Sequence, residues 1–279
     1  MTAPHPWPAP MARRTRLDTE LVRRGLARSR QHAASLVADG RVRVHGTRAH
    51  KSATLVDPAA PVVVDEEQAD AYVSRGGHKL AGALAVFTPT GLVVAGRRCL
   101  DAGASTGGFT DVLLRAGAAE VVAVDVGYGQ LAWSLRTDPR VRVHDRVNVR
   151  HLTPERIGGQ VGVAVADLSF ISLRLVLPAL AACTEPDGDL VLLVKPQFEV
   201  GRERVGAGGV VRDPAQRAEA VLAVATAARE QDLGVAGVTA SPLPGPSGNR
   251  EVFLWLRRGA PPAEPALVRV AAGPAEADR

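Results

Sequence analysis

Lysine is scarce in this chain. Of its 34 basic residues only Lys51, Lys79 and Lys195 are lysine, and the other 31 are arginine. An ammonium can lose its proton and a guanidinium cannot, so a lysine that remains is a candidate for work that arginine cannot perform. Lys195 directly follows the apolar run Leu190–Val194, which is typical of a buried strand. We therefore expect Lys195 to have a chemical role.

Three further absences exclude whole classes of protein. The two cysteines, Cys99 and Cys183, lie far apart and form no CxxC pair, so we expect no disulfide scaffold, no metal site and a cytoplasmic location. The first ten residues have no apolar core, so we expect no signal peptide. The best apolar stretch, residues 161–180, is interrupted by two charged residues and a proline, so we expect no membrane span.

Positive charge is concentrated near the amino terminus. Residues 11–56 contain ten arginines and Lys51 against three acidic residues, a net charge of +8, whereas the whole chain carries +5. A basic segment on a mildly acidic body is typical of a polyanion-binding module attached to a separate domain. A solvated basic surface is the alternative, but so large an excess over so short a segment favours nucleic acid.

The same segment has a recognisable pattern. Apolar stripes predict two short helices within residues 16–40, and alternation around His45-Gly46 predicts a hairpin over residues 41–56. With "RLD" at residue 16, Ser29-Arg30 before the second helix and "GRVRVHG" from Gly40, residues 13–64 resemble the RNA-binding domain of bacterial ribosomal protein S4. The resemblance implies binding of structured RNA.

The predicted RNA contacts are basic residues of this domain and of two later segments. They are Arg14, Arg16, Arg23, Arg28, Arg30, Arg41, Arg43, Arg48, Lys51, Arg75, Arg202 and Arg204.

From residue 76 the pattern changes to alternating strands and helices. Apolar, β-rich runs occur at residues 99–100, 121–125, 141–143, 161–167, 190–195, 235–239 and 251–256, and helices are expected at residues 109–116, 128–135, 171–183 and 215–229. This alternation predicts βαβ units and a mostly parallel, seven-stranded sheet within a domain spanning residues 76–258. We expect a linker at residues 65–75 and disorder at residues 1–12 and 259–279.

A glycine-rich loop, "DAGASTGGF", follows the first strand of this sheet. Its glycines allow a ligand to approach the backbone, but Ser105 stands where a dinucleotide loop would have its second glycine. An adenosyl ligand with an amino-acid group therefore fits better than a dinucleotide, and Asp125 is placed to accept from its ribose hydroxyls. Asp145 either meets the adenine amine or is an ordinary loop carboxylate. The candidate cofactor residues are Asp101, Gly103, Ser105, Thr106, Gly107, Gly108, Phe109, Asp125 and Asp145.

Ionisable residues follow two further strands of the sheet. Asp167 ends "VAVAD" and Lys195 ends "LVLLVK". The carboxyl ends of parallel strands line the ligand crevice, so we expect these side chains to face the cofactor and each other. A buried ion pair without a function is the alternative, but burial of charge makes stability a poor reason to keep one.

Motifs along nearly the whole chain resemble one enzyme family. "YVSRGGHKL", "DAGASTGGFTD", "DLSFISL", "VKPQFEVGRE" and "SGNREVF" are similar to the TlyA (haemolysin A) family within the FtsJ class of RNA ribose methyltransferases. The resemblance implies a Rossmann-like methyltransferase domain, S-adenosylmethionine as methyl donor and a cytidine 2′-hydroxyl of ribosomal RNA, in one or both subunits, as acceptor. It also implies a catalytic tetrad of Lys79, Asp167, Lys195 and Glu251.

Several alternatives stay open at this level. Lys195 is either a neutral base or a cation that stabilises the developing alkoxide. The glycine-rich residues 199–214 are either a mobile surface loop or a lid that orders on phosphate. An NAD-dependent oxidoreductase, a membrane-active haemolysin and a non-catalytic RNA-binding protein are the competing functions. We expect a monomer, because the acceptor is one very large RNA.

Overall fold

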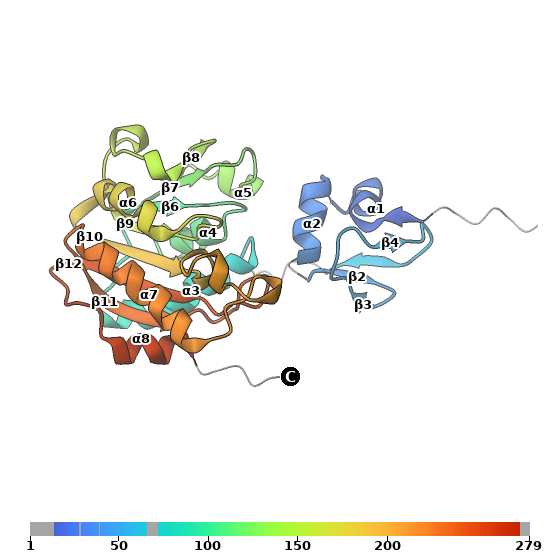
Figure 1. The fold of residues 1–279 in the computed structure, drawn as a ribbon. Helices are drawn as coiled ribbons and strands as arrows, with labels where there is room; N and C mark the ends of the chain where they lie inside the picture. Colours follow the sequence, from blue (N-terminus) through green and yellow to red (C-terminus); the bar gives the residue numbers. More distant parts are fainter. Residues whose placement is uncertain (1–13, 28, 39, 66–71, 274–279) are drawn as a thin grey trace, which may run out of the picture. The chain divides into compact units, whose positions relative to one another are not determined.

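The computed structural model describes residues 14–27, 29–38, 40–65 and 72–273. The chain divides into two compact units, Met1–Ala71 and Tyr72–Arg279, and the division falls within the predicted linker (Figure 1). The predicted disorder of residues 1–12 lies outside the described residues. We describe each unit by itself.

The smaller unit is a compact α+β domain. Its elements are β1 (Thr15–Arg16), α1 (Leu17–Arg23), α2 (Arg30–Ala38), β2 (Val42–Val44), β3 (Thr47–Arg48), β4 (Leu55–Val56) and β5 (Val62–Val64). The helices are amphipathic, and Leu17, Leu21 and Leu36 are buried in one core. His45 and Gly46 take positive φ angles and close the β2–β3 hairpin. The two predicted helices and the hairpin turn at His45-Gly46 are thus confirmed, but the hairpin ends at Arg48 rather than at residue 56, because Leu55–Val56 pair with β1.

The larger unit is built on a seven-stranded sheet of order β11-β12-β10-β9-β6-β7-β8. Five of the strands, β6 to β10, pair in parallel, and β12 is antiparallel to both of its neighbours. The strands are β6 (Arg98–Ala102), β7 (Glu120–Asp125), β8 (Val141–Asp145), β9 (Val161–Ala166), β10 (Thr184–Val194), β11 (Leu233–Ala240) and β12 (Val252–Arg258). The predicted fold class and all seven strands are confirmed.

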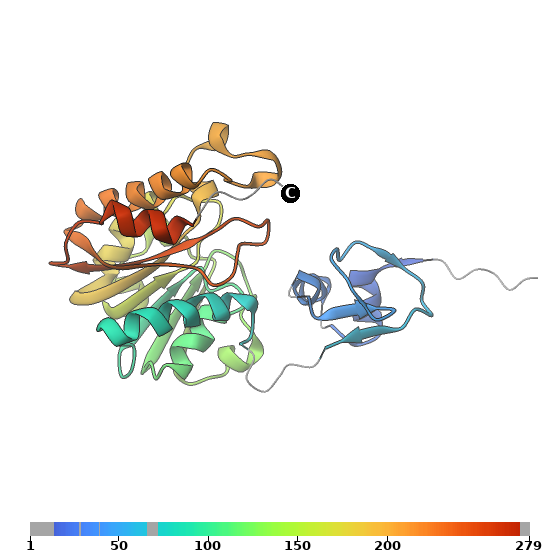
Figure 2. The same ribbon diagram turned by 90° about the horizontal axis from the view of Figure 1, so that it is seen from below.

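Helices cover both faces of this sheet (Figure 2). They are α3 (Arg75–Phe87), α4 (Gly108–Arg115), α5 (Trp133–Arg136), α6 (Leu177–Cys183), α7 (Pro214–Arg229) and α8 (Pro265–Ala272). Residues of β10 alternate between two cores, because successive side chains of a strand point to opposite faces. Leu190 and Leu192 pack with α6, α7 and α8, whereas Val191 and Leu193 pack with α3, α4 and α5.

Short 3-10 turns join these elements. They span Thr88–Thr90, Val149–His151, Glu155–Ile157, Leu173–Leu175, Pro196–Phe198, Arg202–Arg204 and Ala207–Gly209. Among the described residues, no helix combines the length and the apolar character needed to cross a membrane.

Three predicted elements were wrong. The helix expected at residues 128–135 is confined to Trp133–Arg136, because carboxylates at the strand ends bind the amides of Gly127 and Gly129 and hold the preceding residues as a loop. The helix expected at residues 171–183 begins only at Leu177, where Pro178 occupies the first turn. Residues 265–272 of the expected tail form α8, whose buried Val268 packs into the core.

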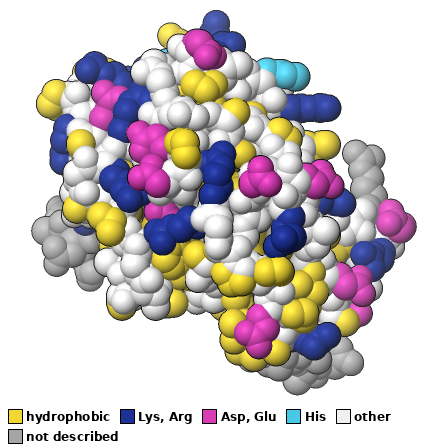
Figure 3. All heavy atoms as spheres, turned by 90° about the vertical axis from the view of Figure 1, so that its left-hand side faces the viewer, with side chains coloured by type: hydrophobic (Ala, Val, Ile, Leu, Met, Phe, Trp, Pro, Cys, Tyr) yellow, Lys and Arg dark blue, Asp and Glu magenta, His cyan; other side chains and the backbone are white. Residues whose placement is uncertain are grey.

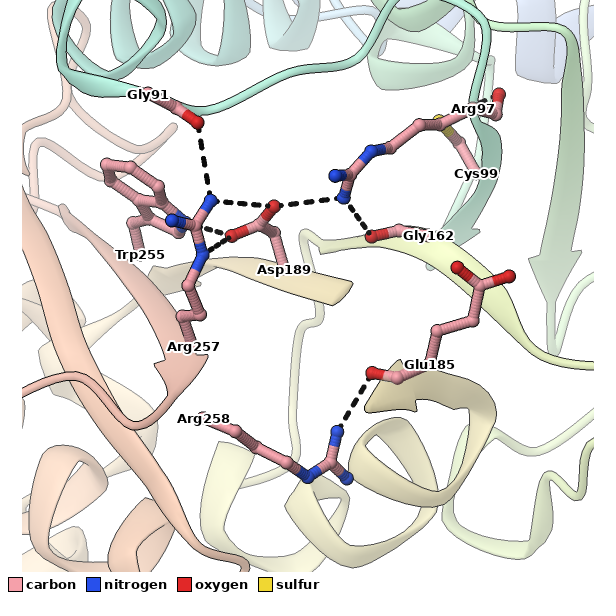
Figure 4. Close-up of polar contacts among 9 residues, drawn as sticks. All are labelled: Gly91, Arg97, Cys99, Gly162, Glu185, Asp189, Trp255, Arg257 and Arg258. Atoms are coloured by element: carbon pink, nitrogen blue, oxygen red, sulfur yellow. Dashed lines mark hydrogen bonds and ion pairs between the residues drawn. The ribbon is translucent and has the colours of Figure 1, made fainter. Parts of the chain in front are cut away.

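A buried network of charged residues lies at the amino ends of the parallel strands. The carboxylate of Asp189 accepts hydrogen bonds from Trp255 Nε1 and Arg257 Nε, both at 2.7 Å, and pairs with Arg97 at 3.2 Å (Figure 4). Arg97 also donates to the carbonyl of Gly162. This network fixes β10, β12 and the start of β6 at one edge of the sheet, away from the carboxyl ends of the strands.

The face of the larger unit drawn in Figure 3 has no field of one sign. Its basic and acidic side chains are interspersed. A face of this kind has no electrostatic preference for a polyanion.

Candidate active site

Two lysine–carboxylate pairs meet at the carboxyl edge of the sheet. Lys79, in α3, lies with its Nζ 2.5 Å from Glu251 Oε2, although 172 residues separate them in the chain. Lys195 Nζ lies 2.5 Å from Asp167 Oδ1 and donates to Ser169 Oγ at 3.0 Å. Lys79, Lys195 and Glu251 are 7%, 8% and 2% exposed. The structure therefore brings together all four residues of the predicted tetrad.

Strand register explains why the two pairs converge. Val194 of β10 lies opposite Val252 of the antiparallel β12, so that Lys195 and Glu251 follow at the same level. Asp167 comes directly after β9, the other neighbour of β10. Burial raises the pKa of Glu251, against the opposing effect of Lys79, and the charges of Lys195 and Asp167 also reach this carboxyl. Its second oxygen, Oε1, has no hydrogen-bond partner within the described part of the chain.

Close packing of α3 against α4 positions Lys79. A Cβ on Gly108 would lie 2.3 Å from Ser74 Oγ and 2.7 Å from the amide nitrogen of Gly77, so glycine is required there. The backbone amide of Val73 also donates to Asp111 Oδ2 in α4 at 3.0 Å. Our sequence analysis assigned no role to Ser74 or Gly77. The only local signal for them was the run "SRGG" one turn before Lys79.

The loop after β6 has the shape of a ligand cradle. Gly103 has a φ of +88°, and a Cβ there would lie 2.7 Å from the carbonyl oxygen of Asp167, so any other residue would be strained and obstructed. Ser105 also adopts a positive φ, and its amide donates to Asp125 Oδ2 at 2.8 Å. Asp125 Oδ1 accepts from the amide of Gly127 at 2.6 Å. Asp125 thus holds both loops that flank the ends of β6 and β7.

Asp101 lies beneath this loop, is fully buried and has a raised pKa. Thr110 Oγ1 donates to its Oδ2 at 2.7 Å. Its other oxygen has no hydrogen-bond partner in the described residues. Burial raises the pKa of Asp101 to about 7, with the Thr110 hydroxyl opposing the shift.

These residues fit an adenosyl cofactor. The glycine backbone leaves room that a Cβ would fill, and a buried carboxyl oxygen lacks a donor. The lone pairs that Asp125 does not use for backbone amides can accept from ribose hydroxyls.

The remaining predicted cofactor residues lie around the same loop. Thr106 and Gly107 form its tip, and Gly107 packs against Leu131. Asp145 Oδ2 pairs with Arg136 at 2.7 Å and accepts from the Gly129 amide at 3.2 Å, so this carboxylate organises the loop after β7. Phe109 is buried, with its ring 6.1 Å from that of Phe253. Its side chain thus packs in the core beneath the loop, and its contact with the cofactor stays a prediction.

Comparison with known proteins agrees with this geometry. Residues 72–258 match the FtsJ-like methyltransferase family, and residues 15–62 match the S4 domain. The chain belongs to the FtsJ-like methyltransferase family. It is 64% identical to the 16S/23S rRNA (cytidine-2'-O)-methyltransferase TlyA of Mycobacterium tuberculosis, over 88% of this chain and 91% of the relative. The predicted TlyA resemblance and the predicted S4-like domain are confirmed.

Two further relatives share the architecture. Hemolysin A of Brachyspira hyodysenteriae is 38% identical over 85% of this chain and 97% of its own. A solved structure of a Streptococcus thermophilus protein that carries the name hemolysin is 39% identical, with a TM-score of 0.72 over 93% of this chain and 94% of that one. Both matches cover more of this chain than the FtsJ-like region, residues 72–258, alone.

In the S4 domain, two buried carboxylates organise the predicted RNA-binding arginines. Asp18 pairs with Arg16 at 2.7 Å and Arg30 at 3.1 Å, and the bond to Arg16 chiefly lowers its pKa. Glu20 pairs with Arg23 and Arg24, both at 2.6 Å. The guanidinium groups of Arg16, Arg23 and Arg30 stay partly exposed, so they are held in place with surface available for phosphate.

The other predicted RNA contacts differ in their surroundings. Arg43 pairs with Asp65 at 3.1 Å, and Arg41 donates to the carbonyl of the same residue. Arg14, Arg48 and Lys51 are exposed and have no carboxylate partner among the described residues. Arg28 lies outside the described residues.

In the methyltransferase domain, the three predicted RNA contacts are not alike. Arg75 is exposed at the start of α3. Arg204 pairs with Glu219 of α7 at 2.7 Å and donates to the carbonyl of Val200, so part of its guanidinium is already occupied. The side chain of Arg202 lies outside the described residues.

Proposed function

We propose that this protein transfers a methyl group from S-adenosylmethionine to the ribose 2′-hydroxyl of cytidines in both ribosomal RNAs. The observation that carries the proposal is the pair of buried lysine–carboxylate contacts beside the glycine loop, in a chain 64% identical to a 16S/23S rRNA (cytidine-2'-O)-methyltransferase. The S4 domain supplies an RNA-binding module, as the substrate requires.

The cofactor, when bound, supplies an electrophilic methyl group on a sulfonium, and the protein aligns an acceptor with it. Gly103, Asp101 and Asp125 hold the donor side of the site. Alignment of donor and acceptor alone supplies several kcal/mol of the barrier. Water-poor surroundings strengthen each electrostatic contact made there.

Lys195 meets the acceptor oxygen. A ribose hydroxyl is a weak nucleophile at neutral pH, so it must lose its proton as it attacks. The hydroxyl proton passes to Lys195 Nζ, and the ammonium that results lies against the acceptor oxygen with Asp167 as its counter-ion. The Lys79–Glu251 pair lies beside the Lys195–Asp167 pair, and the charges of Lys195 and Asp167 both affect the pKa of Glu251. The two pairs are therefore close enough for the charges of one to act on the other.

An exposed aromatic side chain supports a nucleotide substrate. Phe170 lies three residues after Asp167, is 91% exposed and adopts a positive φ of 65°. Its ring lies 5.4 Å from that of Phe198, which follows Lys195 by three residues. Strain of this kind in a non-glycine residue is concentrated at functional sites. We propose that Phe170 stacks on a base of the acceptor RNA. Stacking of this kind tolerates any base, because every base has a π face.

The substrate sets the remaining expectations. Ribosomal RNA places the enzyme in the cytoplasm, and a single large acceptor is served by a monomer. We propose residues 199–214 as a lid over the target nucleotide; hydrogen bonds to Arg217 and Asn249 anchor it at residues 209–212.

The deciding experiment is methyl transfer from labelled S-adenosylmethionine to purified bacterial ribosomal subunits and to naked ribosomal RNA. Wild type and Lys195→Ala run side by side, and nuclease mapping locates the product. Label at a cytidine 2′-hydroxyl that is lost in the variant supports the proposal. Measurable cofactor binding without transfer to any ribosomal substrate would instead favour a non-catalytic RNA-binding protein or a different RNA substrate.

A further inference from the structure

The carboxy-terminal helix α8 lies outside the matched family region, which ends at residue 258. It is nevertheless part of the methyltransferase domain. Val268 and Ala272 are fully buried against the core beneath α7. Its connection to the sheet is also fixed, because the amide of Val235 in β11 donates to the carbonyl of Pro261 at 2.7 Å.

A buried arginine of α7 links the end of α8 to the segment before α7. Arg217 is fully buried, and its Nε donates to the carbonyl of Ala272 at 2.8 Å and its Nη2 to that of Gly273 at 3.2 Å. Its Nη1 donates to the carbonyls of Val211 and Arg212 at 3.3 and 2.6 Å. The last carbonyls of a helix lack partners within the helix and carry partial negative charge, so they suit a guanidinium. One side chain thus joins two segments far apart in the chain.

The same segment is bound on its other side by a residue next to the tetrad. The amide of Val211 donates to Asn249 Oδ1 at 2.9 Å, and Asn249 Nδ2 donates to the carbonyl of Gly209 at 2.7 Å. Asn249 is itself buried and comes two residues before Glu251. A continuous series of hydrogen bonds therefore runs from the end of α8 through Arg217 and residues 206–213 to the connection that carries Glu251.

A cavity brings α8 and the tetrad together a second time. It measures about 320 Å³ and is lined by Ala271 of α8 and by Arg250 and Glu251 of the β11–β12 connection. A Cβ on Gly273 would lie 2.9 Å from Arg250 Nη1, so the end of α8 is packed against the residue that precedes Glu251. The packing of α8 therefore helps to fix the backbone that carries the Glu251 carboxyl.

We propose that α8 positions residues 206–213 and the Glu251 connection for methyl transfer, and that Arg217 is the positioning residue. The activity part of this inference rests on the proposed function. Arg217 contacts none of the four tetrad side chains, so it acts through the backbone it holds. Loss of the Arg217 guanidinium should leave the cofactor-binding side of the site intact and disturb the side that receives the RNA.

The test compares Arg217→Lys and Arg217→Met with a control on the same helix, Arg229→Met, whose side chain is exposed. We expect S-adenosylmethionine affinity within twofold of wild type in all three proteins. We expect kcat for ribosomal subunits to fall at least tenfold in both Arg217 variants and to be unchanged in the control. Trypsin should cleave after Arg204 and Arg212 faster in the Arg217 variants alone.

A second variant keeps the test decisive if Arg217→Met does not fold. Asn249→Asp retains the acceptor oxygen but removes the donor to Gly209, so it releases the same segment from the other side. The losses in kcat for Arg217→Lys and Asn249→Asp should fail to add in the double variant, because coupled residues are non-additive. Wild-type kcat and an unchanged trypsin pattern in folded Arg217→Lys would overturn the inference. If wild type itself transfers no methyl group, the proposed function fails, and the trypsin pattern still decides whether Arg217 holds the segment.

Discussion

Lys195→Arg is the substitution that most directly tests how the acceptor is activated. It keeps a positive charge at the end of β10 but replaces an ammonium, which can lose a proton, by a guanidinium, which cannot. Asp167 and Ser169 would still have a cation to contact. A difference between lysine and arginine at this position therefore reports on proton handling and fine geometry rather than on charge.

The structure sets the size of the expected effect. Lys195 Nζ lies within 2.5 Å of Asp167 Oδ1 and 3.0 Å of Ser169 Oγ, and its side chain is only 10% exposed. A planar guanidinium is longer and wider than an ammonium, so it cannot occupy this position without moving its neighbours. General acid–base catalysis contributes about 10²- to 10⁴-fold, and misplacement adds to the loss. We expect kcat to fall by about that factor, which corresponds to about 3–5 kcal/mol of barrier.

The assay is single-turnover methyl transfer to ribosomal subunits at saturating cofactor, so that product release does not mask the chemical step. Cofactor affinity is measured separately and should stay within threefold of wild type, because the glycine loop and Asp125 are untouched. Lys51→Arg is the matched control, since Lys51 is an exposed lysine of the S4 domain and should tolerate the change.

One result would refute the reasoning. If Lys195→Arg retains more than a third of the wild-type rate while Lys195→Ala is inactive, positive charge alone suffices at this position. Lys195 would then be an electrostatic group, and the proton would leave by another route, with Asp167 as the nearest acceptor.

Three further predictions follow from other parts of the structure. Burial raises the pKa of Asp101 from about 4 to about 7. Its contribution to the free energy of unfolding is therefore complete below pH 4 and is lost as the pH rises through 7. Asp101→Asn should remove up to about 4 kcal/mol of this pH dependence, measured by thermal melts of the cofactor-free protein. Phe170→Ala should leave the melting temperature unchanged and weaken RNA binding by about 1–3 kcal/mol, whereas an unchanged KM for subunits would exclude stacking. Replacing Arg48 and Lys51 by glutamine should lower RNA affinity and reduce the slope of log affinity against log salt by about 1 per lost contact, without a change in kcat at saturating RNA.

The seven strands and the mostly parallel character of the sheet could be predicted from local sequence, but the order of the strands in the sheet could not. Each strand is an apolar run because both faces of a covered parallel sheet are buried, and the runs 161–167 and 190–195 end on the charged residues that reach the site. Residue scarcity added a signal independent of periodicity. Lys195 was singled out by its place after a buried run and by the near absence of other lysines, and the structure places it in the tetrad.

The errors have a common physical origin. Nothing in the local sequence shows that the amides of Gly127 and Gly129 donate to Asp125 and Asp145 at the strand ends, so residues 128–135 were predicted as a helix. Likewise α8 is short, begins with a proline and is rich in alanine, and its Val268 acquires meaning only when α7 is present to cover it. Lys79 and Glu251 lie 172 residues apart, so neither position indicates the other without the fold or a family resemblance.

Several arginines of this chain bind more partners than its two buried lysines do. Arg217 binds four carbonyls, Arg257 grips both oxygens of Asp189, and Arg98 reaches Glu120 together with backbone carbonyls; each uses the fixed fork of the guanidinium to join separate segments. An ammonium is a poor substitute there, because it is compact and its donors share one nitrogen. The tetrad differs, because each lysine there places one compact ammonium beside a carboxylate, Lys79 beside Glu251 and Lys195 beside Asp167. The two buried lysines, Lys79 and Lys195, both belong to the candidate tetrad, so the scarcity of lysine was a useful signal for the candidate site.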